Sequence, residues 1–221
     1  MGDFGNLNAV IWDMDGVIVD SEPSHFESWR KVFDEENIQV SEDKLRETFG
    51  MTSIQVLWEI LGEDVSEERA QEISLEKEKI FRSLIRKEAE FLPGVQNWLA
   101  KFKEKGIPQA LASSGSQKNI DSVLNTLDAG KYFEAVVSGL NMPSKPKPDV
   151  FLLTAEKLGV QPGACMVIED SIAGVKAAKS AGMVCVAVTT TNPAEKLNNA
   201  DLVLDNLMML TEEIIQELFS G

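Results

Sequence analysis

The sequence predicts an α/β fold: a Rossmann-like parallel sheet core flanked by helices, with an inserted all-helical domain. Four short apolar runs, rich in β-branched residues or alanine, are typical of buried strands and occupy residues 9–12, 108–112, 165–168 and 184–188. A weaker run at 135–137 indicates a fifth strand. From the second strand onward, one helix-like pattern lies between each strand and the next. Such alternation favours a parallel sheet covered by helices on both faces.

The helical patterns that alternate with the strands have clear ends. They cover residues 94–105, 116–127, 148–159 and 171–181. Pro93 stands just before the first of them, and Gly159 and Gly182 stand where the third and the last end. Proline before a helix and glycine after it are common signals of helix boundaries.

A long interruption separates the first two strands. Residues 20–91 show only helical periodicity, and the core pattern resumes at Leu92-Pro93-Gly94. We therefore predict a core of residues 1–19 and 92–221 and a helical insert of residues 20–91. The longest helix of this insert, at 66–89, is dense in Glu, Lys and Arg, and we expect most of those charges to face solvent.

The charge balance restricts the possible partners. The chain has 221 residues, with 21 Lys and Arg against 36 Asp and Glu, which gives a formal net charge of −15. A field of that sign repels nucleic acid and anionic membranes, so we expect neither as a partner. The amino terminus lacks a basic segment followed by a long apolar stretch, and no run is apolar enough to span a membrane. We expect a monomer in the cytoplasm.

Polar side chains follow the central strands at the points where the strands end. The first strand leads into Asp13-Met14-Asp15-Gly16, the second into Ser113-Ser114-Gly115-Ser116, and the fourth into Glu169-Asp170-Ser171. Lys145 lies between the third and fourth strands, in the segment 144–149. Ligands of parallel α/β sheets bind beyond the carboxyl ends of the strands, so this edge is the candidate site.

The acids at this edge predict a divalent cation. Asp13 and Asp15 are two apart, so their carboxylates point the same way while the chain is extended. With Glu169 and Asp170, as many as four carboxylates would meet, and such a cluster needs a cation and a lysine to offset its repulsion. Oxygen ligands favour Mg²⁺ over zinc. Any one of these acids could be a simple helix cap, but caps do not require the whole set.

The motifs together resemble a known family. They are VIWDMDGVIVDSEP at 10–23, LASS at 111–114, SKPKPDVF at 144–151 and VIEDSIAGVKAAKSAGM at 167–183. In order and spacing the chain resembles the haloacid dehalogenase (HAD) superfamily of phosphotransferases, and within it the β-phosphoglucomutase-like branch with a helical cap. The resemblance spans nearly the whole chain.

The resemblance implies roles for the residues that match the motifs. Asp13 would be the nucleophile that accepts phosphate, and Asp15 would protonate the leaving oxygen and then activate the acceptor. Ser113 would hold the phosphate, with the amides of the turn through Ser114 and Gly115 also able to bind its oxygens. Lys145 would neutralise charge between the phosphate and the nucleophile.

The resemblance also implies Mg²⁺ as the cofactor. The ion would be held by Asp13, by the main-chain carbonyl of Asp15 and by Asp170, with help from Glu169. A carboxylate with an ordinary pKa is ionised at neutral pH, which suits Asp13 as a nucleophile. Asp15 must hold a proton near neutral pH to act as an acid, and we expect the crowded acidic site to raise its pKa.

Two residues of the insert are candidates for binding substrate. His25, the only histidine, matches a histidine at the cap hinge that β-phosphoglucomutases place beside the general acid. The alternative, a packed or exposed helix residue, stays open. Lys77 corresponds loosely to a lysine of the same caps, and for it a solvated helix charge is the favoured interpretation.

Three functions remain open from the sequence. In the mutase an arginine follows the glycine turn of the cap and grips a second phosphate, whereas this chain has Gly50-Met51-Thr52-Ser53. The difference favours a phosphatase acting on a small phosphorylated metabolite, such as a sugar phosphate, over a β-phosphoglucomutase. Arg46, Arg82 or Arg86 could substitute for that arginine. A non-catalytic module that binds phosphorylated metabolites is the third alternative.

Overall fold

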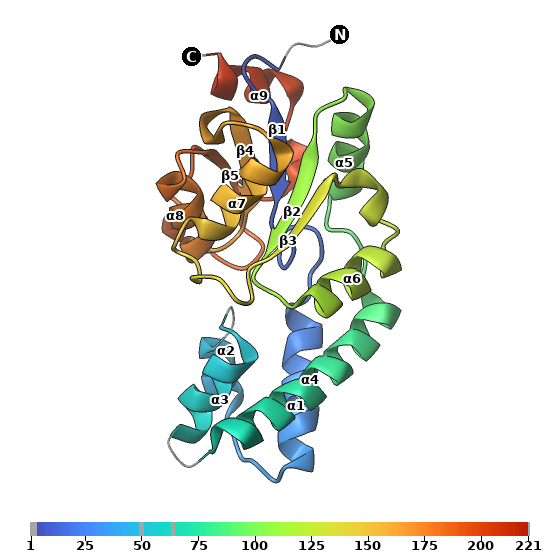
Figure 1. The fold of residues 1–221 in the computed structure, drawn as a ribbon, viewed down its shortest axis with the longest axis vertical. Helices are drawn as coiled ribbons and strands as arrows, with labels where there is room; N and C mark the ends of the chain where they lie inside the picture. Colours follow the sequence, from blue (N-terminus) through green and yellow to red (C-terminus); the bar gives the residue numbers. More distant parts are fainter. Residues whose placement is uncertain (1–3, 49–50, 63–64, 221) are drawn as a thin grey trace.

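The computed structural model describes residues 4–48, 51–62 and 65–220 of the chain. Figure 1 shows a core built around a sheet and, beyond one end of its strands, a bundle of helices. The chain leaves the core for this bundle after β1 and returns before α5. Gly50, part of the turn noted above, lies outside the described residues.

The sheet has six strands, all parallel, in the order β3-β2-β1-β4-β5-β6. The strands are β1 (Ala9–Trp12), β2 (Gln109–Ser113), β3 (Ala135–Ser138), β4 (Cys165–Glu169), β5 (Val184–Val188) and β6 (Leu202–Leu204). The first five confirm the predicted strands within a residue or so at each end. The sixth was not predicted, because a run of 3 residues at the sheet edge carries too little pattern.

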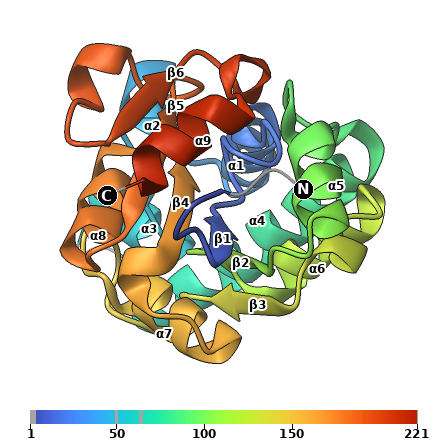
Figure 2. The same ribbon diagram turned by 90° about the horizontal axis from the view of Figure 1, so that it is seen from above.

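Helices cover both faces of the sheet, as predicted. They are α5 (Val95–Glu104), α6 (Gln117–Thr126), α7 (Asp149–Leu158), α8 (Ile172–Ser180) and α9 (Glu212–Phe219). Seen from above in Figure 2, α7 and α8 lie on one side and α5 and α6 on the other. Successive side chains of a strand point to opposite faces, so Trp12 packs in the core beneath α5 and α6 while Ile11 packs in the core beneath α7 and α8.

The register of the central strands brings their carboxyl ends level. Trp12, the last residue of β1, pairs with Leu111 of β2 on one side and with Ile168 of β4 on the other. The next residues along these strands therefore lie at one edge of the sheet. Ser171 caps the helix that follows β4, since its side chain accepts from the Gly174 amide.

The insert contains α1 (Glu22–Glu35), α2 (Glu42–Glu47), α3 (Ser53–Leu61) and α4 (Glu67–Glu88). These helices share an apolar cluster of their own around Trp29, Phe33 and Leu57. The far end of α4 joins the main core instead, through Phe81 and Ile85. Because α4 packs on both parts, it links the insert firmly to the sheet domain.

The two connections between insert and core lie side by side. Val19 forms a bridge with Phe91, and the Leu92 amide donates to the Ile18 carbonyl at 3.1 Å. We keep 20–91 as the proposed bounds of the insert. No helix in the described ranges combines the length and apolar character that crossing a membrane requires.

Candidate active site

The predicted edge of the sheet gathers buried polar residues. Asp13 follows β1, Ser113 ends β2, and Glu169 and Asp170 lie at the end of β4. Their exposed fractions are 7% for Asp13, 1% for Ser113, 0% for Glu169 and 3% for Asp170. Burying this many polar groups is unfavourable unless they are paired, so their partners are informative.

Lys145 is the partner of two of the carboxylates. Its Nζ lies 2.6 Å from Oδ1 of Asp13 and also donates to Oε1 of Glu169. The other lysine of this segment, Lys147, is exposed. The structure thus brings Lys145, and not Lys147, to the nucleophile candidate.

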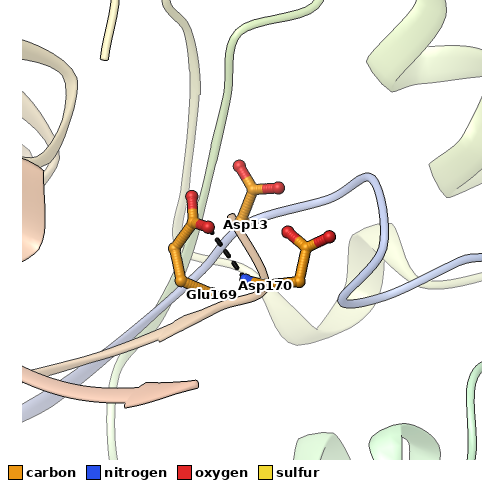
Figure 3. Close-up of side chains that lie close together, drawn as sticks. All are labelled: Asp13, Glu169 and Asp170. Carbon is orange, nitrogen blue, oxygen red and sulfur yellow. Dashed lines mark hydrogen bonds between the residues drawn. The ribbon is translucent and has the colours of Figure 1, made fainter. Parts of the chain in front are cut away.

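Three carboxylates form a group that could hold a metal ion. One oxygen each from Asp13, Glu169 and Asp170 lies within 4.8 Å of the others, and Figure 3 shows the three side chains side by side. Buried, anionic and built from oxygen, this donor set suits Mg²⁺. Asp15 is outside the group, so the expected meeting of four carboxylates is reduced to three.

Glu169 already has many hydrogen-bond partners. Its Oε2 accepts from the amides of Asp170 and Ser171, each at 2.8 Å, and from the Ser171 hydroxyl at 3.0 Å. Its other oxygen accepts from Lys145. The carboxylate therefore fixes both Lys145 and the turn after β4.

The cluster raises the pKa of two of its carboxyls. Burial raises the pKa of Asp13 to about 7; Lys145 opposes this shift, whereas Glu169 and Asp15 add to it. Burial and the charges of Glu169 and Asp13 likewise raise the pKa of Asp170 well above its usual value. The expectation of an ordinary pKa for Asp13 is wrong for the metal-free arrangement, because burial disfavours the charged carboxylate and Lys145 offsets this only in part.

Asp15 turns toward the insert. Its Oδ1 accepts from the Ser21 hydroxyl at 2.5 Å and lies 3.7 Å from Nε2 of His25. Burial alone would raise the pKa of this carboxyl, but hydrogen bonding from His25 and Ser21 and the charge of Lys77 bring the pKa below its ordinary value. The expected rise is therefore wrong: Asp15 faces donors instead of the acidic cluster.

Lys77 and His25 form a buried pair beside Asp15. Nζ of Lys77 lies 2.8 Å from Nδ1 of His25 and 3.1 Å from a carboxylate oxygen of Glu78. Lys77 is only 2% exposed, so its favoured interpretation as a solvated charge is wrong. Burial and the charge of Lys77 lower the pKa of His25. If Lys77 donates to Nδ1, the neutral imidazole carries its proton on Nε2, toward Asp15.

The turn after β2 is held by hydrogen bonds within the turn and leads directly into α6. The Ser113 hydroxyl accepts from the Gly115 amide at 3.0 Å, and Ser114 is exposed. Ser116 caps α6, and its side chain accepts from the Asn119 amide at 3.3 Å. Because α6 begins just after β2 ends, its amino-terminal end, the positive end of the helix dipole, lies at this edge.

Comparison with known proteins identifies the family. The model of the haloacid dehalogenase-like hydrolases matches residues 7–182. This chain belongs to that family. It is 36% identical to the phosphorylated carbohydrates phosphatase of Thermotoga maritima, across 96% of this chain and 98% of the relative. It is 34% identical to the beta-phosphoglucomutase of Bacillus subtilis, across 96% of this chain and 95% of the relative.

Solved structures agree with this assignment. The fold matches the crystal structure of beta-phosphoglucomutase from Clostridium difficile with a TM-score of 0.87 and 32% identity, and the match covers 97% of each chain. The resemblance inferred from the motifs is thereby confirmed, for both the superfamily and its β-phosphoglucomutase-like branch.

Sequence reasoning missed the polar groups that follow β5. Thr191 and Asn192 lie in the loop after that strand, and both hydrogen-bond to Asp170. A signal was present, because the run Thr189-Thr190-Thr191-Asn192 directly follows a predicted buried strand. Ser21 was missed as well, since a serine beside a helix start is usually a cap, and here it makes no such bond.

Proposed function

We propose that this protein is a Mg²⁺-dependent phosphatase that hydrolyses a small phosphomonoester, a sugar phosphate in particular, through an aspartyl-phosphate on Asp13. The observation that carries the proposal is the contact of 2.6 Å between Lys145 and Asp13 inside a buried group of carboxylates. The similarity to a phosphatase of phosphorylated carbohydrates supports the substrate class. We further propose that the protein acts as a cytoplasmic monomer.

The first step forms a bond between Asp13 and phosphorus. Asp13 attacks in line as the ester bond to the leaving oxygen breaks, and that oxygen takes a proton from Asp15. Lys145 offsets the repulsion between the nucleophile and the phosphate. Ser113 and the amides at the start of α6 hold the other phosphoryl oxygens.

The second step regenerates the enzyme. Asp15, now ionised, removes a proton from water, which attacks phosphorus and displaces the carboxylate of Asp13. Asp13, Asp170 and the main-chain carbonyl of Asp15 would hold Mg²⁺. The bound ion would neutralise charge on the phosphoryl oxygens. In this proposal Glu169 mainly secures Lys145, because both of its oxygens already accept hydrogen bonds.

Asp15 must gain a proton before the first step. Its pKa is held low by the donors of the insert. An approaching phosphate dianion acts in the opposite direction, because a nearby negative charge raises the pKa of a carboxyl. Displacement of water by the leaving group adds to this rise. Protonation of Asp15 is thus proposed to accompany substrate binding.

The mutase alternative is weakened by the arginines. Arg46 is exposed, and its guanidinium group donates to Glu22 and Glu42 on the surface of the insert. Arg82 donates to Asn119 of α6 at 2.9 Å. Ser53, in the stretch where the mutase has its arginine, donates to Glu78 instead. Arg86 is exposed. Among the described residues, Arg46, Arg82 and Ser53 are thus engaged by other side chains, which favours the phosphatase over a reaction that must grip a second phosphate.

A panel of phosphate esters decides between the two reactions. It includes β-glucose 1-phosphate with a glucose 1,6-bisphosphate primer, assayed for both free phosphate and isomerised sugar. Net release of phosphate supports the phosphatase, and isomerisation without release supports the mutase. A chain that turns over neither these esters nor p-nitrophenyl phosphate in Mg²⁺ would be the non-catalytic module.

A further inference from the structure

Asp170 receives a hydrogen bond that the catalytic groups do not provide. Lys145 bonds to Asp13 and Glu169, and among the described residues the side chain of Asp170 pairs instead with Thr191. The Thr191 hydroxyl lies 2.5 Å from Oδ2 of Asp170. A hydroxyl at this distance from a buried carboxyl group makes a strong hydrogen bond.

Asn192 determines the direction of this bond. Its side-chain Nδ2 donates to the Thr191 hydroxyl at 3.0 Å and to the main-chain carbonyl of Asp170 at 3.2 Å. Because the hydroxyl oxygen already accepts from Asn192, its single proton is available for Asp170, whose Oδ2 at 2.5 Å is a closer acceptor than its main-chain oxygen at 3.2 Å. The order of donors is therefore Asn192 to Thr191 to Asp170.

Gly16 packs closely against the same carboxylate oxygen of Asp170. A Cβ atom at Gly16 would lie 2.0 Å from Oδ2 of Asp170 and 3.0 Å from Cγ2 of Thr191, so no larger residue fits. The φ angle of Gly16, 78°, also favours glycine. Asp170 is thus held between the turn after β1 and the loop after β5.

We propose that Thr191, oriented by Asn192, is a positioning residue that fixes Asp170 for the divalent cation. The bond to Oδ2 holds the rotamer of Asp170 and leaves its other oxygen for the ion. It also offsets part of the repulsion among three carboxylates, since Asp170 shares no ammonium group directly. The inference rests on the proposed Mg²⁺ site and assigns a role to a loop outside the motifs.

The test is direct binding of Mg²⁺ to the protein without substrate, measured by isothermal titration calorimetry. Thr191→Val keeps the side-chain shape and removes the hydroxyl, and should weaken binding by about tenfold or more, as is usual for loss of a bond to a metal ligand. Thr191→Ser restores the hydroxyl and should bind within about threefold of the unmodified protein. Thr190→Val, at an exposed neighbour, should bind as the unmodified protein does.

Two results would overturn the inference: Mg²⁺ affinity unchanged in Thr191→Val, or equal weakening in the Ser and Val variants. Circular dichroism in EDTA reports folding, and if Thr191→Val does not fold, Thr191→Ala is titrated with the same expectation. The same measurements distinguish failure of this inference from failure of the proposed function. A protein that binds Mg²⁺ through Thr191 but hydrolyses no phosphomonoester refutes only the phosphatase, whereas Asp13-dependent hydrolysis with Mg²⁺ binding insensitive to Thr191 refutes only this inference.

Discussion

The ammonium nitrogen of Lys145 lies 2.6 Å from a carboxylate oxygen of Asp13, although 132 positions separate the two residues in the chain. The same ammonium group also donates to Glu169, which is fully buried. One cation therefore balances two carboxylates, and a third, Asp170, lies beside them. The cluster therefore holds more carboxyl groups than cationic partners, and a divalent ion would supply the missing positive charge.

Removing the charge of Lys145 should remove most of the activity. Lys145→Met keeps much of the side-chain volume but leaves the phosphate and Asp13 to repel each other, so kcat/KM should fall by about 100-fold or more. Lys147→Met is the matched control, because Lys147 is exposed two residues away. Steady-state assays with p-nitrophenyl phosphate measure both. Equal activity of the two variants would contradict the role of Lys145.

Binding of Mg²⁺ should release protons below neutral pH. The pKa of Asp13 is raised from 3.8 to about 7, so this carboxyl holds a proton in the metal-free protein below that pH. The ion must displace this proton, and apparent affinity should rise by up to about tenfold per pH unit for each carboxyl that loses a proton. The contribution of Asp13 levels off near pH 7, and Asp170, whose pKa is also raised, adds to the slope. Calorimetry in buffers of different ionisation enthalpy counts the protons. Affinity independent of pH in this range would refute the shift.

The same shift should affect the stability of the metal-free protein. Between pH 3.8 and about 7 the folded state holds more protons at Asp13 than the unfolded state does. The contribution of Asp13 to the free energy of unfolding therefore falls as pH rises through this window. Urea unfolding in EDTA should show a smaller pH-dependent loss for Asp13→Asn than for the unmodified protein. Parallel pH profiles would contradict the prediction.

Lys77 should matter to stability far more than its neighbour Lys79. Lys77→Met removes the partner of His25 and Glu78 inside the fold, and should lower the free energy of unfolding by about 1–3 kcal/mol. Lys79 is 64% exposed and pairs with Glu76 on the helix surface, so Lys79→Met should cost less than about 0.5 kcal/mol. Urea denaturation of the two variants compares them directly. A Lys77 variant as stable as the Lys79 variant would show that the buried pair contributes little.

Gly174 should tolerate no side chain. A Cβ atom there would lie 1.8 Å from a carboxylate oxygen of Glu169, so Gly174→Ala must displace the residue that secures Lys145. We expect a loss of about 1–3 kcal/mol in stability and a large loss of turnover. Gly163→Ala is the control, because its Cβ would meet only the Gly182 carbonyl at 4.0 Å. Thermal unfolding and phosphatase assays report both effects, and a fully active Gly174→Ala protein would contradict the packing argument.

Most of the fold could be predicted from the sequence, because buried parallel strands are apolar runs that are followed directly by polar residues. Asp13 and Glu169 were placed at one edge for that reason, and the sheet order brings them together. The edge strand β6 escaped prediction, since Leu202–Leu204 is too short to show a period. The matches to the motifs came from the resemblance and not from periodicity.

The electrostatics could not be predicted from sequence, because they depend on which groups face each other across the insert. The pKa of Asp15 was expected to rise with the acidic cluster, but Ser21 and His25 bind its carboxylate and lower the pKa. Lys77 lies on a helix dense in charge, and only the packing of α4 against α1 shows that it is buried. Thr191 acts on Asp170 from a different loop, a contact that no local spacing reveals.

Trapping the phosphorylated intermediate tests the central claim most directly. The protein is mixed with substrate and Mg²⁺, quenched during turnover and reduced with borohydride, which converts an aspartyl-phosphate to homoserine. Mass spectrometry of the peptide that contains Asp13 should find homoserine at that position, and Asp13→Asn should give none. Homoserine at any other aspartate, or turnover with position 13 unmodified, would contradict the assignment of Asp13 as the nucleophile.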